Sequence, residues 1–120
     1  MLFAVSLAGA AGAAARYLVD YAIAESTDSV FPWGTFVINV TGSLALGIVV
    51  GLALHHGLPS TTRIVAGTGF LGAYTTFSTF TYETLQLIEQ SSRAEAVLNV
   101  IASVAAGTAA AAAGLVLTAW

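Results

Sequence analysis

Hydrophobic residues in this chain fall into four long runs that are separated by short polar joints. Each run has the roughly 20 apolar residues that a helix needs to cross a hydrocarbon core about 30 Å thick. Both prolines fall in the joints, where they do not interrupt a helix. The pattern therefore predicts an all-α integral membrane protein, one transmembrane domain of residues 1–120, with helices over residues 2–24, 34–54, 64–88 and 94–119.

Composition supports this reading and excludes several functions. The chain is 58% hydrophobic and 8% charged, against about 25% charged residues in soluble domains. It has no lysine and three arginines, so it offers no basic surface for nucleic acid. It has no cysteine, no phosphate-binding loop and no zinc or catalytic-triad motif, so we expect no enzyme. We expect a multi-pass protein of the plasma membrane, with the lipid bilayer as its surroundings.

The arginines give almost no bias for orientation in the membrane. Arg63 and Arg93 lie in joints on opposite sides, and Arg16 lies near the end of the first run. Topology follows Lys and Arg near helix ends. Two interpretations stay open: both orientations insert and form an antiparallel dimer, or a partner or the translocon fixes one orientation.

The third run contains the most unusual polar pattern. Three glycines over residues 67–72 precede five hydroxyl side chains in the seven positions Thr75–Thr81. Glycine and β-branched threonine weaken a helix, which predicts a break near Gly72–Thr75. Irregular backbone is tolerated at membrane depth only where protein or a cavity buries it. Carbonyls freed there can coordinate a small cation, and hydroxyls and helix ends can attract an anion.

Other polar or aromatic residues share helix faces. Such faces are either helix-packing surfaces or the lining of a pore. Arg16 and Asp20, four residues apart, are either an ion pair or part of a watery vestibule in which Arg16 attracts anions. The shared faces are Asn39 with Gly42 and Ser43, Phe77 with Phe80, and Asn99 with Ser103 and Gly107.

Three segments of the chain resemble the Fluc family of fluoride channels, also called CrcB proteins. They are the glycine-rich first-helix segment Gly9–Tyr17, the second-helix segment Gly34–Ser43 and the third-helix segment Gly72–Phe80. The third is the most specific. The resemblance covers essentially the whole chain, because the order of the motifs and the four predicted spans also fit.

The resemblance implies an antiparallel dual-topology dimer with two fluoride pores. Such a channel exports cytoplasmic fluoride passively down its electrochemical gradient and gives fluoride resistance. By resemblance, the backbone carbonyls of Gly72 and Thr75 hold a structural sodium ion (Na+) at the dimer interface. Arg16 matches a vestibule arginine. The implied pore residues are Asn39, Phe77, Phe80 and Ser103, with Ser78 and Thr79 as weaker matches.

The chain departs from the family pattern at Ala73–Tyr74, where a second glycine and a smaller residue are usual, and at Asn99, where tyrosine is common. Two alternatives stay open. A small multidrug-type cation exporter is expected to carry an acidic residue midway along its first helix, where this chain has Arg16. A non-conducting subunit of a heterodimeric channel would need a paralogous second subunit. The role of Glu83 is left undetermined.

Overall fold

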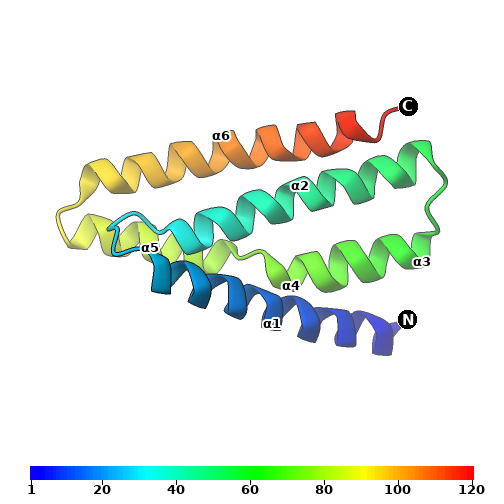
Figure 1. The fold of residues 1–120 in the computed structure, drawn as a ribbon, viewed down its shortest axis with the longest axis horizontal. Helices are drawn as coiled ribbons and strands as arrows, with labels where there is room; N and C mark the ends of the chain where they lie inside the picture. The colour runs from blue at the N-terminus through cyan, green and yellow to red at the C-terminus, as the bar shows by residue number, and fades with distance from the viewer.

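The computed structural model describes all 120 residues as helices joined by short loops, without strands (Figure 1). This confirms the all-α prediction. In chain order the helices are α1 (Leu2–Ser26), α2 (Trp33–His55), α3 (Ser60–Arg63), η1 (Ile64–Leu71), α4 (Gly72–Tyr74), α5 (Phe77–Glu89) and α6 (Arg93–Leu117).

Three helices, α1, α2 and α6, are long and apolar enough by length and composition to cross a membrane. They contain 25, 23 and 25 residues. At a rise of about 1.5 Å per residue each extends about 35–38 Å, more than the roughly 30 Å of a hydrocarbon core. Their ends all fall within two residues of the predicted limits.

The third predicted helix is present as a broken rod. Its first part starts at Ser60 rather than at residue 64, because Pro59 stands at the N-cap and the chain becomes helical directly after it. The glycine-rich segment η1 is a π-helix, in which the Gly72 amide donates to the Gly67 carbonyl five residues earlier. The rod ends with α4, and α5 resumes it at Phe77 after a break at Thr75–Thr76.

Glycines set how closely the helices approach one another. A Cβ atom at Gly114 of α6 would lie 2.5 Å from the Leu44 carbonyl oxygen and 2.6 Å from the Ile48 amide nitrogen of α2. Likewise, a Cβ atom at Gly12 of α1 would lie 3.0 Å from the Phe70 carbonyl carbon of η1. Small residues allow this backbone contact between membrane helices. They hold α6 against α2, and α1 against η1.

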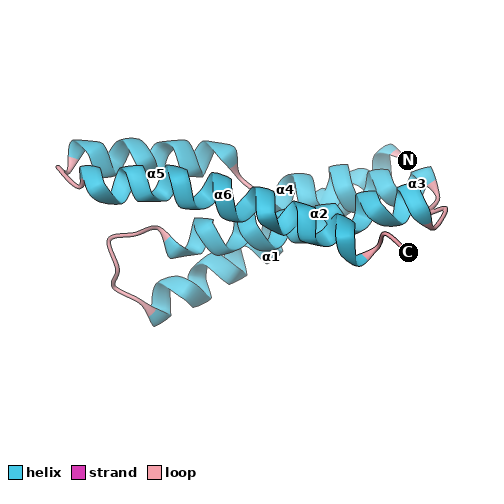
Figure 2. Cartoon of the chain, turned by 90° about the horizontal axis from the view of Figure 1, so that it is seen from above, coloured by secondary structure: helices cyan, strands magenta, loops and turns pink.

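The helices form an elongated bundle whose longest dimension is 48 Å. Both termini lie at the same end, next to α3, and the break between α4 and α5 falls near the middle (Figures 1 and 2). Helix α2 lies between α6 and the broken rod in Figure 1. This arrangement brings the face of α2 that carries Asn39, Gly42 and Ser43 against the break.

Candidate functional site

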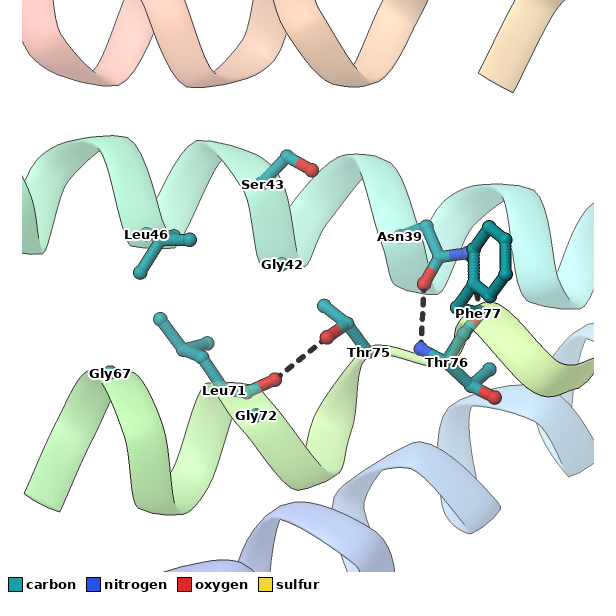
Figure 3. Close-up of a pocket in the computed structure, with 10 residues that line it drawn as sticks. All are labelled: Asn39, Gly42, Ser43, Leu46, Gly67, Leu71, Gly72, Thr75, Thr76 and Phe77. Atoms are coloured by element: carbon teal, nitrogen blue, oxygen red, sulfur yellow. Dashed lines mark hydrogen bonds between the residues drawn. The ribbon is translucent and has the colours of Figure 1, made fainter. Parts of the chain in front are cut away.

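The helix break is held by an asparagine from a neighbouring helix. Thr75 and Thr76 have extended backbone, with φ/ψ of −79°/157° and −146°/117°. The Asn39 side-chain amide of α2 faces Thr76 (Figure 3). Its Nδ2 donates to the Thr76 carbonyl at 3.0 Å, and its Oδ1 accepts from the Thr76 amide at 2.9 Å. Asn39 thus takes over the bond that the Thr76 amide would donate in a continuous helix, and it adds a second donor to the Thr76 carbonyl, which as the N-cap also starts the hydrogen bonding of α5.

These side-chain bonds leave two backbone carbonyls without their usual helical donors. The Thr76 amide would reach the Gly72 carbonyl in a continuous helix, but it donates to Asn39 instead. The Thr79 amide would reach the Thr75 carbonyl, but it donates to the Thr76 hydroxyl at 3.2 Å. The carbonyls of Gly72 and Thr75, which the family resemblance singled out, are therefore among the acceptors released by the break.

Hydroxyl groups cluster where α5 begins. The Thr76 hydroxyl caps the helix, and it lies 3.1 Å from the Thr79 hydroxyl and 3.4 Å from the Ser78 hydroxyl. The first amides of a helix have no intrahelical acceptor and carry a partial positive charge. The start of α5 therefore combines amide and hydroxyl donors, which suit an anion.

A cavity of about 310 Å³ lies between α2 and the broken rod (Figure 3). Phe77 lines it and is 79% exposed, while its ring centroid lies 6.0 Å from that of Phe80. The two phenylalanines are therefore adjacent, as their spacing predicted. The cavity is lined by Asn39, Gly42, Ser43, Leu46, Gly67, Leu71, Gly72, Thr75, Thr76 and Phe77.

A second, more polar cavity of about 230 Å³ lies on the α1 side of the break. Arg16 and Asp20 of α1 line it together with Thr76 and Thr79. Thr76 lines both cavities. Arg16 and Asp20 form no ion pair with each other. Arg16 therefore lines the same cavity as two members of the hydroxyl cluster, Thr76 and Thr79.

The sequence reading missed a contact beside this second cavity. Thr35 of α2 is buried and donates a 2.5 Å hydrogen bond to the Glu83 carboxylate of α5. Thr35 lies four residues before Asn39, so it shares a helix face with it. That spacing is the signal that could have found it. The sequence alone does not indicate a partner for Glu83, because its contact with Thr35 depends on α2 lying beside α5.

Ser103 lines neither of these cavities. Its hydroxyl donates to Asn99 at 3.3 Å, and Asn99 in turn donates to Thr84 of α5 at 2.8 Å. The structure therefore joins Ser103 to α5 through Asn99, not to Asn39 or Arg16.

Tyr74, one of the departures from the family pattern, is the last residue of α4. Its hydroxyl lies 3.0 Å from the Thr41 hydroxyl of α2, and its ring stacks on Phe70 with centroids 6.0 Å apart. The larger side chain therefore adds a contact between α2 and the helix that precedes the break.

The long apolar helices define a multi-pass integral membrane protein. Polar groups gathered at an interrupted helix are typical of membrane proteins that move small solutes or ions. The family model described as CrcB-like protein, Camphor Resistance (CrcB), matches residues 3–115. The chain belongs to this CrcB family.

Curated relatives carry a functional name. The chain is 50% identical over 110 residues to fluoride-specific ion channel FluC 1 of Streptomyces avermitilis, covering 91% of this chain and 89% of the relative. It is 45% identical over 115 residues to fluoride-specific ion channel FluC of Nitrobacter winogradskyi, covering 95% and 91%. It is 45% identical over 107 residues to FluC 2 of Mycobacterium bovis, covering 89% and 82%.

Proposed function

We propose that this chain forms a fluoride-selective channel in the plasma membrane, through which cytoplasmic fluoride leaves the cell passively. The observation that carries the proposal is the helix break, where α5 begins with hydroxyl and amide donors next to Phe77 and Phe80. The relatives named fluoride-specific channels over most of the chain length support the choice of anion.

The donors at the break suit a small anion whose hydration is strong. Conduction requires that protein groups replace part of the water, while binding stays weak enough for release. Hydroxyl groups donate hydrogen bonds, and aromatic rings offer a positive edge. We propose that Asn39, Phe77, Phe80 and Ser103 line the path, with Ser78 and Thr79 at its side. Arg16 would raise the local anion concentration in the second cavity.

Passive movement is sufficient for export. The cell interior is negative, so the membrane potential drives an anion outward through an open path. Hydrofluoric acid crosses membranes in its neutral form and dissociates inside, where fluoride would otherwise accumulate. A channel would therefore confer fluoride resistance without an energy source, and no enzymatic step is needed.

We also propose that the chain crosses the membrane four times and works as an antiparallel dimer. The α3–α5 rod runs along the bundle, and both termini lie at one end (Figure 1). Phe77 is 79% exposed beside the first cavity, where a second copy or a paralogous subunit can cover it. The nearly balanced arginines agree with insertion in both orientations.

The released carbonyls fit a structural sodium ion. Gly72 and Thr75 offer neutral oxygens whose helical donors are diverted, and hard cations prefer oxygen ligands. Bound there, a sodium ion would place a positive charge between the helix breaks of the two subunits and hold the breaks together. In this chain, Asn39 and the Thr76 hydroxyl keep those carbonyls free by holding the competing amides.

The test is fluoride efflux from liposomes that contain only this purified chain, with chloride as the control ion. Rapid efflux selective for fluoride is expected. Drug-gradient transport instead of fluoride efflux would favour the multidrug-type alternative. Absence of all transport by folded protein would contradict a homomeric channel, and recovery on adding a paralogous chain would identify a heterodimer.

A further inference from the structure

Asn99 is the one polar side chain in the chain that is completely buried, with 0% exposure. It lies in α6 among mainly apolar residues, with the Ser103 hydroxyl one turn further along the helix. A buried amide destabilises a fold unless its donor and acceptor both find partners. Both halves of the Asn99 amide are bonded, so its position is tightly specified.

The hydrogen bonds of Asn99 run in one direction, from α6 to the backbone of α5. The Ser103 hydroxyl donates to Asn99 Oδ1 at 3.3 Å, and Asn99 Nδ2 donates to the Thr84 hydroxyl at 2.8 Å. Thr84 then donates to the Phe80 carbonyl at 2.8 Å. The Asn99–Thr84 bond is the single side-chain hydrogen bond between α5 and α6.

We infer that Asn99 is a positioning residue, which fixes α5 against α6 at the level of Phe80 and holds the Ser103 hydroxyl in a resting orientation. The inference rests on the proposed fluoride channel and adds to it a residue that the family pattern does not provide, because tyrosine is common at this position.

The unequal bond lengths give Ser103 freedom that Thr84 lacks. The two links on the α5 side are 2.8 Å long, within the range of strong O–H and N–H hydrogen bonds, whereas the Ser103 link is 3.3 Å long. If the proposed path runs past Ser103, its hydrogen could turn toward an anion while the two bonds on the α5 side stay in place. An anion needs a donated hydrogen, and Asn99 accepts that hydrogen when no anion is present.

Breaking the Asn99–Thr84 bond from either side should have the same effect. Asn99→Leu keeps a side chain of similar size without the amide, and Thr84→Val removes the hydroxyl. Each variant should lower fluoride efflux about fivefold to tenfold, the equivalent of one net hydrogen bond, and lower the fluoride-to-chloride efflux ratio. The double variant should be no worse than either single variant, because both remove the same bond.

The efflux ratio separates positioning from a merely structural role, since loss of folded protein reduces both ions equally. The matched control is Thr108→Val, which changes an exposed threonine on the same helix and should leave efflux and ratio unchanged. Unchanged ratios in Asn99→Leu and Thr84→Val, or effects that add in the double variant, would overturn the inference.

A transport-independent measurement keeps this result distinct from the proposed function. The chain has two asparagines, Asn39 and Asn99, so selective ¹⁵N labelling gives two side-chain amide signals by NMR. Thr84→Val should shift the Asn99 signal and speed its hydrogen exchange, and leave the Asn39 signal in place. An unmoved Asn99 signal would refute the contact. If the unmodified chain alone moves no fluoride, the homomeric channel is contradicted, and the NMR result decides by itself whether Asn99 bonds to Thr84.

Discussion

Replacing Asn39 with leucine should destabilise the protein by removing the side chain that holds the helix break. Leucine is close in size, so the main loss is of two hydrogen bonds to the backbone of Thr76, at 3.0 and 2.9 Å. Thr76 is buried. The Thr76 amide left unsatisfied costs about 1–3 kcal/mol, and the bond lost at its carbonyl, which still accepts within α5, costs about 0.5–1.5 kcal/mol, so the total loss is about 1.5–4.5 kcal/mol. Against a typical total of about 5–15 kcal/mol, this is a large fraction.

The free energy of unfolding can be measured in detergent micelles by circular dichroism, with sodium dodecyl sulfate as the denaturant. Thr81→Val is the control, because the Thr81 hydroxyl is exposed and bonds only to the Phe77 carbonyl of its own helix. A surface change of this kind should stay within about 0.5 kcal/mol. Asn39→Leu should also abolish fluoride efflux, since the start of α5 would lose its position.

The reasoning is refuted if Asn39→Leu unfolds at the same denaturant concentration as Thr81→Val. That result would mean that water, or a rearranged helix, satisfies the Thr76 backbone as well as the amide does. Reduced stability with normal efflux would separate the two roles: Asn39 would hold the break without being needed for conduction.

Three further predictions concern the path and the packing. Phe80→Ile should sharply reduce fluoride efflux from liposomes while the protein still folds, because the ring edge is lost; normal efflux would remove Phe80 from the pore assignment. Arg16→Gln should lower fluoride efflux several-fold at low ionic strength and much less at high ionic strength, because salt screens the attraction between the Arg16 charge and the anion. Equal losses of efflux at both salt concentrations would contradict this. Gly114→Val should lower stability by about 1–3 kcal/mol or more in the same micelle assay, because its Cβ would overlap the backbone of α2; unchanged stability would show that α6 can move away.

The position of the break illustrates how far local sequence signals reach. Glycines and threonines predicted an interruption near Gly72–Thr75, and the structure has it at Thr75–Thr76, after the short helix α4. Propensity alone locates a weak region of helix. The residue at which the chain leaves the helix is decided by Asn39, which comes from another helix and bonds to Thr76.

The same limit applies to the polar side chains. The sequence grouped Asn99 and Ser103 on one face of a helix, and the structure joins them at 3.3 Å. Their link to Thr84, and the bond between Thr35 and Glu83, depend on which helices are neighbours. Arg16 and Asp20 share a face as expected, yet they line a cavity without pairing.

The sequence by itself determined the helices, because the hydrophobic runs and the prolines in the joints are local properties. An unbroken apolar run of membrane-spanning length satisfies its own backbone hydrogen bonds in a bilayer only as a helix. It also determined which residues are polar at membrane depth. Only the tertiary structure decided which of those residues meet. Partners such as Asn39 and Thr76 are 37 positions apart, and their contact requires α2 to lie against the broken rod. Close packing of glycines on facing helices sets that arrangement, which no single helix encodes.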